Sequence, residues 1–203
     1  YQFVTISDRS AANSGNSVNF DSVDIYEGTY VIGKSIVDTS NPDQKFTLTD
    51  PNADTSTLTV KVQNSTSDTT STTYTKATDI TQLNASSTVY YLQEAERGRF
   101  EVYFGDGVVS KALTNGNIVI LQYVVTNKGV ANGVSTFSSS TAIDGVTDVV
   151  VTTVSGAVGG AEPETVDSIK LNAPLNYSAQ GRAVTTSDYE VYVKRLFPNT
   201  QSV

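Results

Sequence analysis

The sequence contains neither cysteine nor histidine among its 203 residues. Without cysteine there is no disulfide, no thiolate metal site and no cysteine nucleophile. Without histidine the commonest zinc ligand, the usual general base at neutral pH and the serine triad are all missing. These two absences remove a large part of enzyme chemistry from consideration.

Basic residues are also scarce. Thirteen Lys and Arg stand against 21 Asp and Glu, so the formal net charge is -8 and the pI is about 4.4. A field of this sign repels nucleic-acid phosphates and anionic lipid head groups. The sequence has no long apolar run and its start, YQFVTISDRS, has no secretory pattern. We therefore expect no nucleic-acid partner and no membrane partner. Because the chain begins at Tyr1 and has no methionine, we interpret it as a fragment of a longer protein.

Residues that favour strands dominate what is present. The chain has 27 Val, 9 Ile and 28 Thr against 9 Leu. Branching at Cβ suits the pleated surface of a sheet, and this composition excludes a helical bundle. We predict an α+β fold that is predominantly β, with antiparallel β domains followed by a short helical C-terminal part.

Residues 1–87 are predicted to form a β-rich domain, with strands within residues 22–36, 45–49 and 56–62. In the last of these, apolar and polar residues alternate with the period of two that marks a strand with one buried face. Residues 64–73 (NSTSDTTSTT) are too polar to bury, so we expect a mobile Ser/Thr loop or a long hairpin tip there.

Residues 88–158 are predicted to form a second β domain, with strands at 88–94, 99–104, 117–126 and 148–154. The last two are apolar enough for burial on both faces. Between the second and third strands, Gly105-Asp106-Gly107 reads as a tight turn in which the Asp106 carboxylate accepts backbone N–H groups.

Residues 159–203 have helical character, and we interpret them as an incomplete C-terminal domain. The sequence Glu162-Pro163-Glu164 predicts the start of a helix that runs to Pro174. A second helix is predicted from Thr185, because Asp188 stands three positions later as in a capping box.

Three groups of residues imitate chemical sites, and in each we prefer a structural interpretation. Asp50, Asn52, Asp54 and Ser56 resemble the opening of a calcium loop, but the sixth position is Thr55 and the twelfth is Lys61, so a β-turn at Asp50-Pro51 is favoured. The glycines at 156, 159 and 160 lie between a predicted strand and a predicted helix, as in a phosphate-binding loop. The acids at 162 and 164 would repel a phosphate, so a linker is favoured.

The third group is a set of clustered carboxylates. Glu94, Glu96, Glu101 and Asp106 could supply a glycosidase pair, but pairing with Arg97 or Arg99 on a solvent face is the simpler interpretation. We therefore predict no catalytic residue, no metal site, no cofactor and no enzyme activity.

Two ordered motifs carry a family resemblance. The segment from residue 96 to 133 contains Phe-Gly-Asp-Gly, a glycine before an apolar strand with Tyr, Thr-x-x-Gly and Ala-Asn-Gly. The segment from residue 159 to 190 contains GGAEPET, an Ala-Pro pair and RAVT followed by DYE. Together they resemble the family of baseplate wedge and baseplate J-like proteins of T4-like contractile-tailed phages. The matching residues of the first motif are Phe104, Gly105, Asp106, Gly107, Gly116, Tyr123, Thr126, Gly129, Ala131, Asn132 and Gly133.

The resemblance implies a structural subunit of a phage tail baseplate wedge that forms dimers and links neighbouring wedges into the ring around the hub. Its partners would be copies of itself, as a homodimer within the ring, and other wedge proteins. It would be assembled in the host cytoplasm and reside in the virion tail baseplate. The alternative from the residues alone is a β-rich carbohydrate-binding or adhesin module, because eleven tyrosines could stack on sugars.

The predicted second helix is the candidate interface. Its apolar side chains fall on one face at helical spacing, and aromatic residues are common anchors of protein contacts. The same residues could instead pack onto the preceding β domain, as amphipathic helices often do. They are Tyr189, Tyr192, Val193, Leu196 and Phe197.

Overall fold

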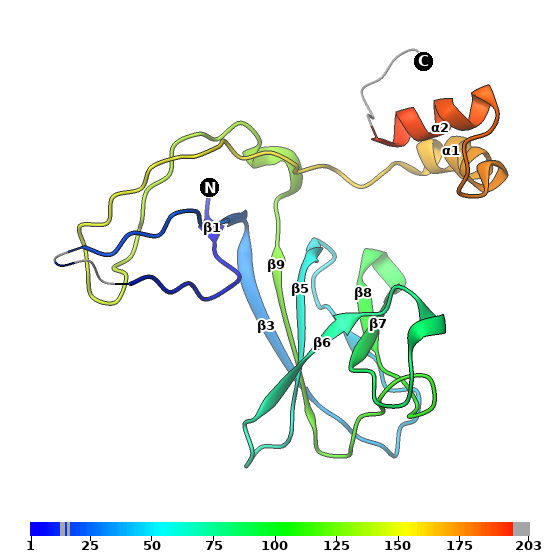
Figure 1. The fold of residues 1–203 in the computed structure, drawn as a ribbon, viewed down its shortest axis with the longest axis horizontal. Helices are drawn as coiled ribbons and strands as arrows, with labels where there is room; N and C mark the ends of the chain where they lie inside the picture. Colours follow the sequence, from blue (N-terminus) through cyan, green and yellow to red (C-terminus); the bar gives the residue numbers. More distant parts are fainter. Residues whose placement is uncertain (13–14, 16, 197–203) are drawn as a thin grey trace. The chain divides into compact units, whose positions relative to one another are not determined.

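The computed structural model describes residues 1–12, 15 and 17–196, and contacts divide the chain into one unit at Tyr1–Gly160 and another at Ala161–Val203. Figure 1 shows the strands of the first unit and the helices of the second. The strands described in the first unit are β1 (Phe3–Val4), β2 (Tyr26–Glu27), β3 (Thr29–Ile36), β4 (Phe46–Thr47), β5 (Ala53–Gln63), β6 (Ser71–Lys76), β7 (Val89–Glu94), β8 (Phe100–Tyr103) and β9 (Ile118–Val125).

Seven of these strands form one sheet in the order β3-β9-β5-β6-β7-β8-β4, while β1 pairs with β2 alone. The neighbours are antiparallel except for β6 and β7, which are parallel. The predominantly β, antiparallel fold class is therefore confirmed. The division expected near residue 87 has no counterpart in this sheet, because β6 and β7 pair across it and β9 lies between β3 and β5.

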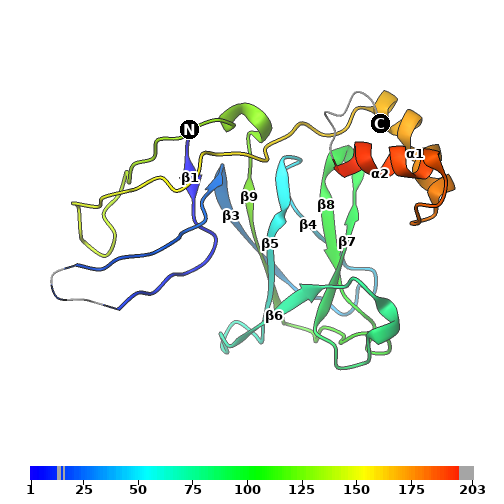
Figure 2. The ribbon, with the colours of Figure 1, turned by 45° about the horizontal axis from the view of Figure 1, so that its top comes forward.

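The core lies on one face of this sheet. A single cluster of buried apolar side chains contains residues from both halves of the strand order. The sheet therefore curls around one interior (Figures 1 and 2). Its members include Phe46, Leu48, Val60, Val62, Tyr74, Tyr90, Val102, Val119, Leu121 and Tyr123.

Six strands, β2, β3, β4, β7, β8 and β9, fall within segments that the sequence pattern predicts, and β5 extends beyond the predicted segment 56–62 at both ends. The strand predicted at 148–154 is wrong: these residues have no strand pairing, and Val150 and Val154 are 89% and 81% exposed. A strand exists only when a neighbouring strand receives its backbone hydrogen bonds, and the valine-rich composition supplies no such neighbour.

The polar segment at 64–73 is the tip of the β5–β6 hairpin, although residues 71–73 already belong to β6. Its polar side chains bond to the tip itself. Asn64 Nδ2 donates to Asp68 Oδ2 at 2.7 Å, and the Thr70 N–H donates to Asp68 Oδ1 at 3.0 Å. These bonds lower the pKa of the Asp68 carboxyl below its usual value, with the Asn64 amide as the largest cause.

Two long loops leave the sheet near one end of β9. The first follows β1 and is closed at its base by the β1–β2 pair. Residues 135–155 are closed by two backbone bonds: the Ala157 N–H donates to the Val134 carbonyl at 2.7 Å, and the Gly133 N–H donates to the Ala157 carbonyl at 2.8 Å. The rings of Phe3 and Phe137 meet edge to face at 5.0 Å, which joins the bases of the two loops.

The second unit holds α1 (Val166–Ala179) and α2 (Thr186–Leu196). The end predicted at Pro174 is wrong, because α1 continues through that residue to Ala179. A proline removes one helical N–H donor, but it does not prevent later residues from bonding. The start of α2 is as predicted: Asp188 N–H donates to Thr185 Oγ1 at 3.3 Å, and Thr185 N–H donates to Asp188 Oδ2 at 2.8 Å. Neither helix has the length and apolar character needed to cross a membrane.

The hydroxyl of Tyr123 ties β9 to the chain beyond β4. Tyr123 is 2% exposed, and its Oη accepts from the Thr49 N–H at 3.2 Å and lies 3.2 Å from Thr49 Oγ1. This contact joins two segments that are 74 residues apart.

We expect Tyr123→Phe to lower the free energy of unfolding by about 1 kcal/mol, the usual net worth of one such hydrogen bond. Urea unfolding followed by circular dichroism measures it. The matched control is Tyr103→Phe, because the Tyr103 hydroxyl makes no hydrogen bond within the described chain and its ring keeps its stacking on Tyr91 at 5.1 Å. Equal losses in the two variants would contradict the assigned role of the Tyr123 hydroxyl.

Candidate functional site

The Gly105-Asp106-Gly107 segment forms the predicted turn at the end of β8. Asp106 Oδ1 accepts from the N–H of Val108 at 2.9 Å and from that of Val109 at 3.4 Å. These two backbone donors lower the pKa of the Asp106 carboxyl below its usual value. The Gly107 N–H donates to the Ser110 carbonyl at 2.9 Å, and Gly107 has a φ of +87°. The carboxylate therefore organises its own turn.

Gly105 is required for a different reason. A Cβ on Gly105 would lie 2.0 Å from Ser110 Oγ and 2.7 Å from the Ser110 carbonyl oxygen. Ser110 is fully buried, and the Tyr91 hydroxyl donates to its Oγ at 3.3 Å, so it has little room to move. The glycine permits the close approach that closes the loop.

Two further motif residues position the strands. Phe104 packs edge to face against Phe46 at 5.7 Å and Tyr74 at 5.4 Å, so it fills the core beside the turn. Gly116 leads into β9, and its N–H donates to the Val37 carbonyl at 3.0 Å. Both residues serve the packing of the sheet.

At the far end of β9, the Glu27 carboxylate binds the segment that follows the strand. Glu27 Oε2 accepts from Thr126 Oγ1 at 3.0 Å and from the Asn127 N–H at 2.9 Å, while Oε1 accepts from Asn127 Nδ2 at 2.6 Å. Partial burial on its own raises the pKa of this carboxyl, but the hydrogen bonds from Asn127 and Thr126 outweigh it, so the pKa lies below its ordinary value.

Asn132 then binds Gly160, where the first unit ends. Asn132 Nδ2 donates to the Gly160 carbonyl at 2.7 Å, and the Gly160 N–H donates to Asn132 Oδ1 at 3.1 Å. A Cβ on Gly160 would lie 2.2 Å from the Lys128 carbonyl oxygen, and one on Gly129 would lie 3.3 Å from the Gly160 carbonyl oxygen. The close approach requires glycine at 160, and at 129 a side chain would make a tight contact.

The structure thus brings together the ends of the two sequence motifs. Thr-x-x-Gly and Ala-Asn-Gly from the first motif meet Gly160 from the second, and Gly133 supports them with an N–H bond to the Ala157 carbonyl at 2.8 Å. We call this cluster, Glu27 with Thr126–Gly133 and Gly160, the joint. The Asp106 turn is not part of the joint, because it follows β8 and the joint follows β9.

Sequence reasoning missed Glu27. It lies 99 residues before Thr126 and 100 residues before Asn127 in the sequence, and no motif includes it. The only available signal was that Thr126 and Asn127, at the end of a buried strand, carry polar groups that require partners.

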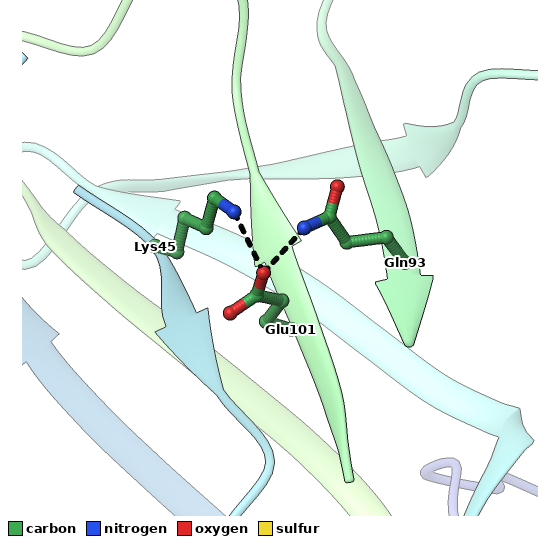
Figure 3. A network of polar contacts seen from close by, with 3 residues as sticks. All are labelled: Lys45, Gln93 and Glu101. Atoms are coloured by element: carbon green, nitrogen blue, oxygen red, sulfur yellow. Dashed lines mark hydrogen bonds and ion pairs between the residues drawn. The ribbon is translucent and has the colours of Figure 1, made fainter. Parts of the chain in front are cut away.

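Glu101, one of the clustered carboxylates, is held by two polar side chains. Figure 3 shows the side chains of Lys45 and Gln93 directed at the carboxylate of Glu101. Lys45 Nζ donates to Glu101 Oε1 at 2.8 Å, and Gln93 Nε2 donates to the same oxygen. The Lys45 and Gln93 bonds lower the pKa of the Glu101 carboxyl below its usual value. The expected pairing of Glu101 with Arg97 or Arg99 is therefore wrong: Lys45 on the segment leading into β4 takes their place.

The calcium-like segment is a turn, as the sequence favoured. Asp50 Oδ1 accepts from the Asn52 N–H at 2.8 Å, and Asp54 Oδ1 accepts from the Ser56 N–H at 2.9 Å. Across the described residues, no three Asp or Glu side chains are grouped so that they could hold a metal ion.

The candidate interface residues lie on α2. Tyr189 and Leu196 are exposed, Tyr192 and Val193 are half-buried, and Phe197 falls outside the described residues.

We expect Gly105→Ala to lower the free energy of unfolding by about 2 kcal/mol, because the new methyl group would meet a buried serine and its backbone. Thermal or urea unfolding measures it. Gly33→Ala in β3 is the control, because its nearest neighbour would be 3.9 Å away, and the change should stay within about 0.5 kcal/mol. Equal losses in the two variants would contradict the close-approach argument.

We expect the Glu27 bonds to give a pH-dependent stabilisation. Because the folded pKa lies below the ordinary value of a glutamate, the stabilisation is present at pH values above that ordinary pKa and is lost as the pH falls through the folded pKa. Glu27→Gln should therefore be less stable than the wild type at pH 7, with a difference that shrinks in acid. Urea unfolding across this pH range measures it, with exposed Glu96→Gln as control. A difference that grows in acid would refute the role of Glu27.

Comparison with known proteins agrees with these motifs. Residues 34–136 match the family described as bacteriophage baseplate wedge protein gp6, third domain. This range contains the Asp106 turn and most of the joint but not the helical unit. The chain is also 28% identical over 138 residues to the baseplate wedge protein gp6 of Enterobacteria phage T4, an alignment that covers 56% of this chain and 20% of that relative.

The family match covers half of the chain, and it includes every residue of the first motif together with the strands that position it. The chain therefore belongs to the family of bacteriophage baseplate wedge protein gp6, third domain, and is a structural component of the phage tail baseplate.

Proposed function

We propose that this chain is a non-enzymatic subunit that forms dimers and links neighbouring baseplate wedges into the ring around the tail hub. Its partners in this proposal are a second copy of itself and other wedge proteins. The observation that carries the proposal is a difference between the two units. The motif residues of the first unit are used in holding the fold, while the second unit leaves its apolar side chains uncovered.

The polar groups of the joint support a role without chemistry. The carboxylate of Glu27 accepts bonds from Thr126 and Asn127, and the Asn132 side chain is engaged on both its donor and its acceptor atoms. Groups already bonded in this way fix the backbone, and they are not placed for proton transfer to a substrate.

The helical unit supports the proposal of a protein contact. Among its described residues Ala179 is the buried apolar side chain, whereas several large apolar side chains on both helices remain exposed. Two short helices do not hide these side chains against each other, and exposed apolar surface is common at protein interfaces. The exposed residues are Val166, Ile169, Leu171, Leu175, Tyr177, Tyr189 and Leu196.

Charge supports the exclusion of other partners. A net charge of -8 disfavours contact with DNA, whose binding needs clustered Lys and Arg to release counterions, so we propose no nucleic-acid contact although the family belongs to a phage particle. The same charge disfavours anionic membrane surfaces.

We expect the wild-type chain to sediment as a dimer at micromolar concentration and Tyr189→Glu to sediment as a monomer, because the charge would be buried without a partner. Ser187→Glu, at an exposed polar position of the same helix, is the matched control and should leave the dimer intact. Circular dichroism verifies that both variants remain folded. A monomeric wild type, or a dimer that tolerates Tyr189→Glu, would contradict the proposed contact.

A further inference from the structure

We propose that residues 148–154 of one copy add as an antiparallel strand to the free edge of β3 in a second copy. This inference rests on the proposed dimer and assigns it a second contact, outside the helices. We call residues 148–154 the valine segment. The proposal joins two features of the first unit that the fold leaves without a partner.

The first feature is the outer edge of β3. In the strand order β3 is terminal, with β9 on one side only, and Figures 1 and 2 place it at the edge of the sheet. Two contacts hold the ends of this edge: the Gly28 N–H donates to the Gln2 carbonyl at 3.0 Å, and Gln44 Nε2 donates to the Ile36 carbonyl at 3.0 Å.

Between these two contacts no other strand of the described chain pairs with this edge. Backbone groups alternate in direction along a strand, so residues an even number of positions from Gly28 and Ile36 direct their N–H and C=O groups outward. These are Tyr30, Ile32 and Lys34. Ile32 is also 51% exposed through its side chain. An open edge with an exposed apolar side chain is a template for another strand.

The second feature is the valine segment itself. Its sequence, DVVVTTV, consists of β-branched residues after one aspartate, yet the segment makes no strand pairing in its own copy. Except for half-buried Val149, its side chains are exposed. It lies in the loop that the Val134–Ala157 bonds close at the base, so it is presented as part of a long projection from the sheet.

The two features match in length and charge. Lys34 is the charged residue of β3, and Asp148 is the charged residue of the valine segment. Neither has an ion-pair partner within the residues that the structure describes. An antiparallel register with Lys34 opposite Asp148 also places Ile32 opposite Val150 and Tyr30 opposite Thr152. All three open positions of the edge are then used, and opposite charges and β-branched side chains face each other.

This match identifies the partner as a second copy. A lysine on an exposed edge usually discourages strand addition, because an incoming apolar strand would bury its charge. The valine segment carries the acid that removes this penalty at the position where it is needed. Because each copy carries both the edge and the segment, two copies can exchange segments reciprocally, as a two-fold symmetric contact requires.

Cysteine pairs test the register directly, because the wild-type chain contains no cysteine. One chain carries Ile32→Cys and the other Val150→Cys, and the two are mixed under mild oxidation. Residues directly opposite in an antiparallel pair are close enough for a disulfide. We expect a cross-linked heterodimer on a non-reducing gel. Val151→Cys, whose side chain would lie on the other face of the sheet, is the matched control.

A failure of Ile32→Cys and Val150→Cys to cross-link, or equal cross-linking with Val151→Cys, would overturn the proposal. So would a cross-link formed within one chain when Ile32→Cys and Val150→Cys are combined, because the segment would then occupy its own edge.

Charge reversal gives an independent measurement. We expect Lys34→Glu to weaken the dimer by about tenfold over two symmetric contacts, and Lys34→Glu combined with Asp148→Lys to restore it. Sedimentation equilibrium measures both. A double variant as weak as Lys34→Glu would refute the pairing of these residues. If the cross-link fails while Tyr189→Glu still dissociates the dimer, strand addition is wrong and the proposed function stands.

Discussion

The pairing of β9 with strands on both sides is the interaction on which the first unit depends. β9 lies between β3 and β5, and its inner face carries Val119, Leu121 and Tyr123 into the core. Because β3 and β5 come from early in the chain and β9 from after the Asp106 turn, this strand joins parts that are far apart in sequence. Without β9, β3 would lose its neighbour in the sheet and β5 would keep only β6. The family motif therefore surrounds this strand for a physical reason.

The joint extends the same constraint beyond the end of β9. Glu27 binds the residues directly after the strand, and Asn132 binds Gly160, which lies 28 residues further along the chain. The chain between them can make its long excursion at residues 135–155 without disturbing the sheet, because both ends of the excursion are bonded at the base. Loop-closure entropy rises slowly with length, so a firmly closed base makes such a long loop tolerable. The glycines at 129 and 160 are the residues that let the two ends approach.

The sequence predicted the parts of this fold that are encoded locally. Alternation in β5, apolar character in β9 and the Thr185–Asp188 cap each depend on neighbouring residues, and each is present in the structure. The interactions that depend on distant partners were not predictable from a pattern, as the Glu27 bonds and the Lys45–Glu101 pair illustrate. Pattern also failed at residues 148–154, where the composition of a strand is present and its partner is not. Propensity describes how a segment fits a sheet, and it does not supply the neighbouring strand.

The interior and the periphery of the protein differ in how fully their polar and apolar groups have partners. No buried side-chain polar atom of the described residues lacks a hydrogen-bond partner, so the interior of the fold is complete. Among the described residues, the outer edge of β3, the valine segment and exposed apolar side chains of α1 and α2 are peripheral features without a partner. A protein that functions alone usually protects open edges and covers large apolar surfaces. A component of an assembly can leave them for its neighbours, and a completed core with an uncompleted periphery is the arrangement that such a component requires.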